Sequence, residues 1–342
     1  MTTEEVPAGA PGAAVRAGWR AARPWHVAMA AYLAALAWFL ATQGMPLDRG
    51  MQAAWILAGM LAWQVGRPLR RWGRTLGDWL PFFAALVVYD HTRGVADTLG
   101  RPVLVEGLVE AETALFGGEL PTLVLQDLFF DPVTVQWYDV VAAVIYFSHF
   151  FVAWTIAAVL YVLRRESWWF YTKLVLTLTY LGLLTYVLLP AAPPWYAAQQ
   201  GLVDPIERAA TRGWWEIGMQ SAGRLLENAQ ADVNLVAALP SLHAGTSMLV
   251  VLWAWPRVRS VWARAALAGY AVGMGVTLVY GGEHYVLDVL MGWAYAAAVV
   301  WFWTWWERRT RVTPSTAGRA ARLPAGGEPA PAGSPAGLRP EG

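Results

Sequence analysis

The chain contains a succession of apolar segments, each close to the length that an α-helix needs to cross a lipid bilayer. A spanning helix needs about 20 mostly apolar residues, within a range of about 17–25. Eight such segments occur, at about 26–44, 51–66, 76–90, 137–163, 168–189, 241–255, 261–280 and 285–306. Three of them are short (51–66, 76–90 and 241–255) and would either borrow flanking residues or be buried within the bundle, so eight is a working count. The pattern predicts an all-α, polytopic transmembrane helix bundle.

The composition supports this class of protein. Hydrophobic residues make up 57% of the 342 residues and charged residues 14%, with a mean hydropathy of +0.38. An ordinary soluble domain has roughly 25% charged and 45–50% apolar residues, so a soluble or a disordered chain is excluded. With no Cys, disulfides, thiolate catalysis and Cys-ligated metal centres are excluded. A net charge of +1 gives no general attraction to nucleic acid.

Arginine clusters predict the orientation of the bundle, because cytoplasmic loops of membrane proteins are enriched in Lys and Arg. The clusters lie at 16/20/23, 67/70/71/74, 164/165, 257/259/264 and 308/309/311. Eight spans with the N-terminus inside place all of these clusters in the cytoplasm. The same topology places regions 91–136 and 190–240 and the turn 281–284 outside. Pieces 103–116 and 121–130 are predicted to be amphipathic and to lie near the interface.

The histidines are concentrated at one predicted face. His91, His243 and His284 fall at the outer ends of spans, whereas His149 lies mid-membrane and His26 at an interface. An ionisable residue at membrane depth is a functional-site hypothesis by default, and a packing role for His149 is the alternative. The concentration predicts a site at the outer face, with His91 and His149 as candidate lining residues.

A polar stretch at 238–245 precedes a predicted helix. Pro240 suits the start of a helix, where its missing N–H does no harm. Ser241 and the N–H groups of the first turn form an anion-binding end, and His243 lies on that turn. Ser241 is therefore a candidate phosphate ligand and His243 a candidate acid. The plainer alternative is a Ser cap beside an interfacial His.

A second polar stretch places an acid inside a predicted span. His284 and Asp288 are four residues apart and would share a helix face. A charged residue there costs about 2.5–3.5 kcal/mol on insertion scales, so Asp288 is expected to pair with His284. Such a pair makes the other ring nitrogen a nucleophile or base, although it also fits a purely structural role. Tyr280 is a candidate lining residue, and the backbone of Gly281 and Gly282 would approach a phosphate closely.

Arg93 and Arg101 are the basic residues of region 91–136, which is otherwise rich in acids. Guanidinium groups at the membrane surface suit a phosphate, and pairing with Asp90, Asp97 or lipid headgroups is the alternative.

Together the three stretches supply what phosphoryl transfer needs. The oxygens need cations and N–H donors, the phosphorus needs a nucleophile in line, and the leaving oxygen needs an acid. No metal site is expected, because His284 and Asp288 lack a further ligand set.

The sequence resembles the type 2 phosphatidic acid phosphatase (PAP2) superfamily of membrane lipid phosphatases and phosphotransferases. Residues 240–243, Pro-Ser-Leu-His, match its second motif, Pro-Ser-Gly-His, and 284–288 match the His-x-x-x-Asp end of its third. The Leu-His-Ala-Gly run at 242–245 is most similar to the inositol-phosphorylceramide-synthase branch, whose members are inositolphosphotransferase-like. The resemblance is specific over about 235–295 and loose over 90–240. It implies a PAP2-like six-helix core.

The resemblance also implies the roles of three residues. His284 would be the nucleophile and form a phosphohistidine, Asp288 would orient it, and His243 would be the general acid. No metal or other cofactor would be required. The implied partners are a lipid phosphate or phospholipid, and an alcohol acceptor or water.

Two departures from the family pattern concern phosphate-binding arginines. The first family motif, Lys-x6-Arg-Pro, is represented by Arg93-x7-Arg101-Pro, which is one residue longer and begins with Arg. The third family motif begins Ser-Arg, whereas Thr277 and Leu278 stand here, so one arginine is missing. The groups expected to offset its charge are Arg93, Arg101, Arg208, Arg212, Arg224 and the backbone of Gly281 and Gly282.

These observations divide the chain into four parts. They are a cytoplasmic N-terminal segment (1–25), two N-terminal transmembrane helices (26–75), a PAP2-like catalytic membrane domain (76–310) and a disordered cytoplasmic tail (311–342). Regions 91–136 and 190–240 are the extracytoplasmic parts of the catalytic domain. The prediction is an integral cell membrane protein with both termini in the cytoplasm and its active site on the other side.

The leading interpretation is a phosphotransferase that acts on lipid phosphate esters through a phosphohistidine. It would pass a phosphoryl group or a phospho-headgroup, with phosphoinositol as one candidate, to an alcohol. A lipid phosphatase of phosphatidic acid or polyprenyl phosphate type, which uses water, is the alternative within the same chemistry. A non-catalytic lipid-binding protein is another alternative, motivated by the missing arginine. A transporter is disfavoured, because the polar residues cluster at one face rather than along a path.

Overall fold

The computed structural model describes residues 23–44, 46, 49–96, 99–216 and 237–311. The chain divides into two units, residues 1–300 and residues 301–342. The described part of the second unit, 301–311, is helical. Residues 1–22 of the predicted N-terminal segment, Arg224, and the predicted tail from residue 312 onward lie outside the described residues.

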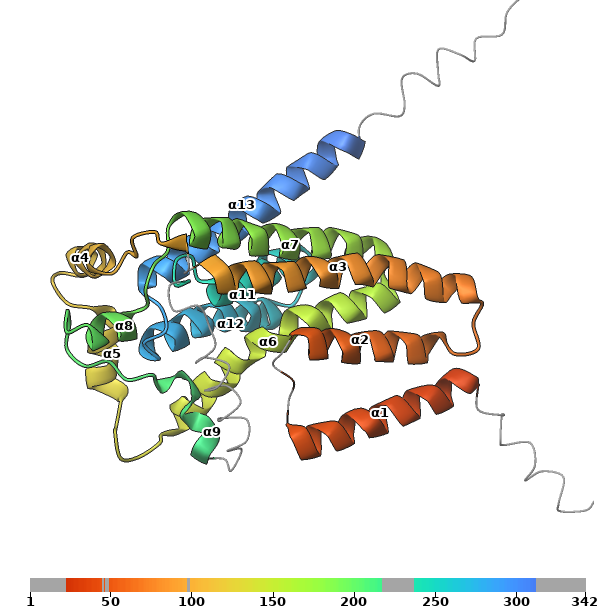
Figure 1. Ribbon diagram of the computed structural model, residues 1–342, viewed down its shortest axis with the longest axis horizontal. Coiled ribbons are helices and arrows are strands. Elements are labelled where there is room, and N and C mark those ends of the chain that lie inside the picture. The colour runs from red at the N-terminus through yellow and green to blue at the C-terminus, as the bar shows by residue number, and fades with distance from the viewer. Residues whose placement is uncertain (1–22, 45, 47–48, 97–98, 217–236, 312–342) are drawn as a thin grey trace, which may run out of the picture. The chain divides into compact units, whose positions relative to one another are not determined.

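The described part of the chain is built from helices, as the sequence predicts (Figure 1). They are α1 (Pro24–Gln43), α2 (Arg49–Gln64), α3 (Leu69–Ala96), α4 (Glu106–Leu115), α5 (Pro121–Phe129), α6 (Trp137–Leu163), α7 (Arg165–Leu188), α8 (Pro194–Gln199), η2 (Ala209–Thr211), α9 (Gly213–Glu216), α11 (Leu242–Ala254), η3 (Trp255–Arg257), α12 (Val261–Tyr280) and α13 (Val286–Arg311).

Five helices in this part are long and apolar enough to cross a membrane. They are Pro24–Gln43, Trp137–Leu163, Arg165–Leu188, Val261–Tyr280 and Val286–Thr310. The predictions at 137–163 and 261–280 agree with α6 and α12 at both ends. The expected count of eight spans is not confirmed within the described residues.

The other three predicted segments form helices that do not meet this criterion. α2 has 16 residues and α11 has 13. At 1.5 Å per residue α11 is about 20 Å long, which is less than the hydrocarbon thickness of about 30 Å. The apolar run at about 76–90 borrows flanking residues at both ends, because α3 has 28 residues, from Leu69 to Ala96. Charged residues toward both ends of α3 hide its length from a search for apolar runs.

α11 lies among three longer helices. It packs against α6, α7 and α12, and α6 packs in turn against α7 and α12. α3 packs on α7, and α1, α2 and α3 are successive neighbours (Figure 1). The start of α11, which follows the Pro-Ser-Leu-His motif, is therefore enclosed by other helices rather than placed at the edge of the bundle.

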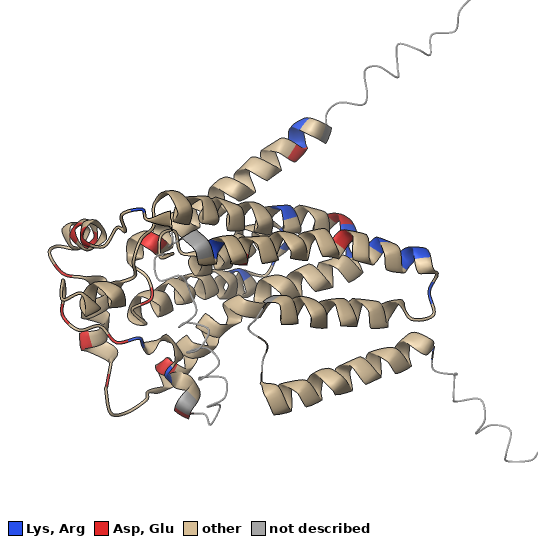
Figure 2. Ribbon diagram, viewed as in Figure 1, with Lys and Arg blue, Asp and Glu red and all other residues tan. Residues whose placement is uncertain are grey.

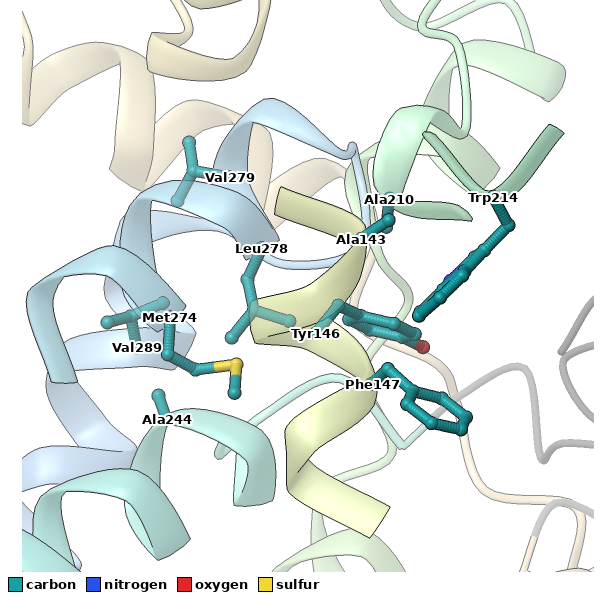
Figure 3. Close-up of a cluster of buried hydrophobic side chains, with 10 residues drawn as sticks. All are labelled: Ala143, Tyr146, Phe147, Ala210, Trp214, Ala244, Met274, Leu278, Val279 and Val289. Atoms are coloured by element: carbon teal, nitrogen blue, oxygen red, sulfur yellow. The ribbon is translucent and has the colours of Figure 1, made fainter. Parts of the chain in front are cut away.

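The hydrophobic core beside α11 combines segments that are far apart in the sequence. Buried side chains from α6, α11, α12, α13 and residues 209–216 form one cluster (Figure 3). Its members are Ala143, Tyr146, Phe147, Ala210, Trp214, Ala244, Met274, Leu278, Val279 and Val289. Burying a large apolar side chain contributes about 1.5–3 kcal/mol, so this cluster holds the helices that carry the histidines in one arrangement.

The connections predicted to lie outside contain short helices and a small ladder. α4 and α5 form within the predicted pieces 103–116 and 121–130. Leu104 pairs with Ala191, and Ala191 pairs with Ala237, so both long connections meet just ahead of the motif. Asp and Glu are most frequent around α4, α5 and α8, whereas Lys and Arg gather mainly where α3 begins (Figure 2).

Candidate active site

His284 and Asp288 meet, as predicted. Nδ1 of the imidazole lies 3.3 Å from Oδ2 of Asp288, and both residues are buried, Asp288 completely. The same carboxylate oxygen accepts a hydrogen bond of 2.9 Å from the Tyr285 N–H. Asp288 therefore holds the start of α13 and the imidazole at once. With its hydrogen on Nδ1, His284 has Nε2 as its basic nitrogen.

The pair does not share a helix face, which corrects the sequence prediction. α13 begins at Val286, so His284 lies in the turn before the helix. Gly282 forms this turn with a φ of 72°, a conformation that favours glycine. The N–H groups of Glu283 and His284 both donate to the Leu278 carbonyl. Backbone hydrogen bonds to the end of α12 thus fix the nucleophile candidate.

His243 lies in the first turn of α11 and close to His284, with ring centroids 5.9 Å apart. α6 supplies three more rings around it. Tyr146 stacks on His243 at 5.0 Å with an interplanar angle of 15°, His149 lies at 4.0 Å, and Phe150 makes an edge contact at 5.9 Å. The structure therefore brings His149 beside the predicted acid, and the rings of Tyr146 and Phe150 hold the His243 ring in place.

Two glycines allow α11 and α13 to approach closely. A Cβ on Gly292 would overlap the carbonyl oxygen of Ser241, and a Cβ on Gly245 would lie 3.1 Å from the carbonyl oxygen of Gly292. The Ser241 N–H donates to the Asp288 carbonyl at 3.0 Å. Small residues at such crossings are typical of membrane helices. This crossing brings together the helix starts that carry His243 and Asp288.

Ser241 is the N-cap of α11. It is fully buried, and its Oγ accepts a hydrogen bond of 3.3 Å from the Ala244 N–H, which is the usual role of serine at this position. Leu242 replaces the glycine of the family motif and packs where Gly182 of α7 has no side chain. Because Ser241 has this structural partner, its binding of phosphate stays a prediction.

Gly281 and Gly282 are required by chain packing. Their N–H groups donate to carbonyls in the last turn of α12. A Cβ on Gly281 would lie 2.8 Å from Cβ of Ala210, and one on Gly282 would lie 2.7 Å from Cγ2 of Ile206. Both N–H groups are therefore paired and both glycines face protein atoms. This corrects the expectation that their backbone cradles a phosphate.

Arg93 lies in the last turn of α3. Its guanidinium is 6.0 Å from the ring centroid of Tyr89, one helical turn earlier on α3. The Tyr186 hydroxyl of α7 donates a hydrogen bond of 2.8 Å to the Pro240 carbonyl. The binding of phosphate by Arg93 stays a prediction.

Three other predicted site residues have different surroundings. Arg101 is exposed and donates to the Leu188 carbonyl at 3.5 Å. His91 is exposed on α3, and its place in the lining of the site stays a prediction. The Tyr280 hydroxyl donates a hydrogen bond of 2.6 Å to the buried carboxylate of Asp139, so this group is engaged away from the histidine pair.

Two arginines from region 190–240 are bound by carboxylates. Arg208 donates two hydrogen bonds of 3.1 Å to Glu283, the residue before His284. Arg212 lies 3.7 Å from the buried carboxylate of Asp139. Arg208 is thus the better placed of the two to supply the charge of the missing third-motif arginine. The position of that arginine is taken by Leu278, a fully buried member of the core cluster (Figure 3).

Sequence reasoning misses two contributors to the site. Tyr146 stacks on His243, and Glu112 of α4 accepts hydrogen bonds from the N–H groups of Val286 and Leu287. In the sequence Glu112 is one of several acids in its region, and no local pattern sets it apart. Within the described residues, no group of three or more His, Asp or Glu side chains is placed to hold a metal ion.

The sequence model of the PAP2 superfamily matches residues 121–302, more than half of the chain. The chain belongs to the PAP2 superfamily. The matched range includes α6, α11, α12 and the start of α13, so His243, His284 and Asp288 all lie within it. Together with the apolar helices, this makes the chain an integral membrane enzyme of the lipid phosphotransferase and phosphatase class, as the sequence predicts.

Two curated proteins resemble the chain over roughly two thirds of its length. It is 28% identical over 243 residues to a phosphoinositol dihydroceramide synthase of Bacteroides thetaiotaomicron, covering 66% of this chain and 75% of that protein. It is 26% identical over 228 residues to an inositol phosphorylceramide synthase of Candida albicans, covering 62% of this chain and 45% of that protein. Both names agree with the branch that the Leu-His-Ala-Gly run indicates. No solved structure matches the chain.

Proposed function

We propose that this PAP2 enzyme transfers a phosphoinositol headgroup from an inositol phospholipid to the hydroxyl of a ceramide-type lipid. The names of the two relatives, which specify phosphoinositol and ceramide, support the choice of donor and acceptor. The single observation that carries the reaction is the arrangement of His284 between Asp288, 3.3 Å from Nδ1, and His243, 5.9 Å between ring centroids.

In the first step, Nε2 of His284 attacks the phosphorus of the donor phosphodiester. The N–P bond forms while the bond from phosphorus to the diacylglycerol oxygen breaks, and His243 gives its proton to that oxygen. Asp288 stabilises the positive charge that develops on the imidazole. The two products of this step are diacylglycerol and the phosphohistidine enzyme.

In the second step, the acceptor hydroxyl attacks the phosphohistidine. His243, now neutral, takes the hydroxyl proton, and the N–P bond breaks to restore His284. The headgroup has moved between two alcohols and no water is consumed. Tyr146 and Phe150 cover His243 with apolar ring surface, and this limits water at the position where the hydroxyl must be activated.

The test is product analysis with the purified full-length chain in detergent. Donors are an inositol phospholipid, phosphatidic acid and a polyprenyl phosphate, each with ceramide, with diacylglycerol or without an acceptor. We expect an inositol-containing phosphodiester product that depends on ceramide. Free phosphate regardless of the acceptor would instead assign a phosphatase, and no product from any donor would overturn the catalytic proposal.

The histidine roles are tested with His284→Ala and His243→Ala in the same assay. Both variants should lose activity by on the order of 10³-fold or more, because the nucleophile or the proton donor is absent. His26→Ala is the matched control, since that histidine is exposed on α1, and it should keep wild-type turnover. Full turnover by His284→Ala would exclude a phosphohistidine at this residue.

A further inference from the structure

A buried carboxylate from α4 reaches the start of the helix that carries Asp288. Glu112 is 0% exposed. Its Oε1 accepts a hydrogen bond of 2.7 Å from the Val286 N–H, and its Oε2 accepts one of 3.0 Å from the Leu287 N–H. These are the first two residues of α13, directly after the His284 turn.

These hydrogen bonds supply acceptors for the first N–H groups of α13. The first N–H groups of a helix have no partner within the helix, and leaving them unpaired in a buried place is unfavourable. Asp288 accepts from the N–H of Tyr285, the residue before the helix. Glu112 accepts from the next two. Two carboxylates, one from inside the helix and one from α4, thus complete its first turn, and their negative charge complements the positive helix end.

The packing of α4 directs Glu112 to this place. Leu108 lies one turn earlier on α4, and it packs in a buried cluster with Tyr285, Ala191 and Leu239. Because residues four apart share a helix face, the burial of Leu108 in the cluster that contains Tyr285 places Glu112 toward the same turn. Burial raises the pKa of Glu112, and the two backbone hydrogen bonds oppose that rise.

We propose that Glu112 is a positioning residue for the catalytic pair. By fixing the N–H groups of Val286 and Leu287, it sets the first turn of α13 and thereby the placement of Asp288 against His284. This inference rests on the proposed function, in which the pair performs the attack on phosphorus. It assigns no contact between Glu112 and substrate.

The test compares Glu112→Gln with Glu110→Gln in the full-length chain. Glu110 lies on the exposed side of the same helix, so its variant is the matched control. In Glu112→Gln an amide NH2 replaces one acceptor and faces a backbone N–H. We expect kcat to fall about 10–100-fold, because small displacements of reacting groups have effects of this size, while KM stays within about threefold. Glu112→Asp, which keeps the carboxylate, should recover part of the loss.

A purely structural role predicts a different result. If Glu112 only stabilised the fold, the variant would lose melting temperature and active fraction, and the remaining folded protein would have wild-type kcat. That result, or a rise in KM without a fall in kcat, would overturn the proposal. A wild-type chain without transfer activity would count against the proposed function instead.

Amide hydrogen exchange tests the anchoring without any turnover. In Glu112→Ala the N–H groups of Val286 and Leu287 should exchange at least about tenfold faster than in the wild type, because their hydrogen-bond acceptor is lost. Glu110→Ala should leave them unchanged. Unchanged exchange in Glu112→Ala would overturn the proposal even if the enzyme is active.

Discussion

The charge of Asp288 can be separated from its hydrogen bonds. One oxygen, Oδ2, faces both the Tyr285 N–H and Nδ1 of His284, so an amide oxygen in that place accepts the same two bonds. For Asp288→Asn we expect a folded protein whose kcat is lower by on the order of 10²–10⁴-fold, because a neutral amide does not stabilise the imidazolium. Steady-state turnover measures this, with Asp127→Asn on the exposed face of α5 as control. Activity close to that of the control would rule out an electrostatic role.

The residues that sequence predicts well are those whose partners are near in the chain. His284 and Asp288 are four residues apart, so local spacing predicts their pairing, although His284 lies in the turn before α13 and not on the same helix face. Glu112 and Val286 are 174 residues apart in the sequence, and only the packing of α4 brings them into contact. The same limit explains the prediction for Gly281. The local motif suggested that this glycine faces a ligand, whereas Ala210, which is distant in the sequence, packs against it.

At the scale of helices, the crossing of α11 and α13 determines the distance between the two histidines. Gly292→Ala would place a methyl group against the Ser241 carbonyl oxygen, and overpacking of this kind costs about 1–3 kcal/mol. We expect a lower melting temperature and at least about a tenfold loss of kcat, as His243 moves away from His284. Gly269→Ala in α12, where a Cβ meets nothing within 4 Å, should retain activity. Equal activity of the two variants would show that the close crossing is not needed.

Helix bounds are predictable where an apolar run and the helix end together. This holds for α6 and α12, whose ends agree with the sequence prediction. It fails for α3, where the helix continues through Arg70, Arg71 and Arg74 at one end and Arg93 at the other. A hydropathy search finds the residues that suit the lipid interior, whereas backbone hydrogen bonds determine where a helix ends. The apolar run is therefore shorter than the helix wherever charged residues continue the helix.

At the scale of the whole molecule, basic and acidic side chains gather toward different ends of the bundle. Lys and Arg gather mainly where α3 begins, and acids surround α4, α5 and α8 (Figure 2). α4 is also the helix that supplies Glu112 to the catalytic turn. Under the positive-inside rule, this polarity supports the prediction that the active site faces the extracytoplasmic side.

The absence of cysteine makes this orientation directly measurable. Glu110→Cys and Arg70→Cys introduce single thiols at exposed positions on α4 and α3. In intact cells, a membrane-impermeant maleimide should label Glu110→Cys at once and Arg70→Cys only after permeabilisation. The wild-type chain has no thiol and gives the background, and retained transfer activity shows that both variants are folded. The reverse labelling pattern would place the site in the cytoplasm. The donor headgroup and the acceptor hydroxyl would then have to be supplied from the cytoplasmic leaflet.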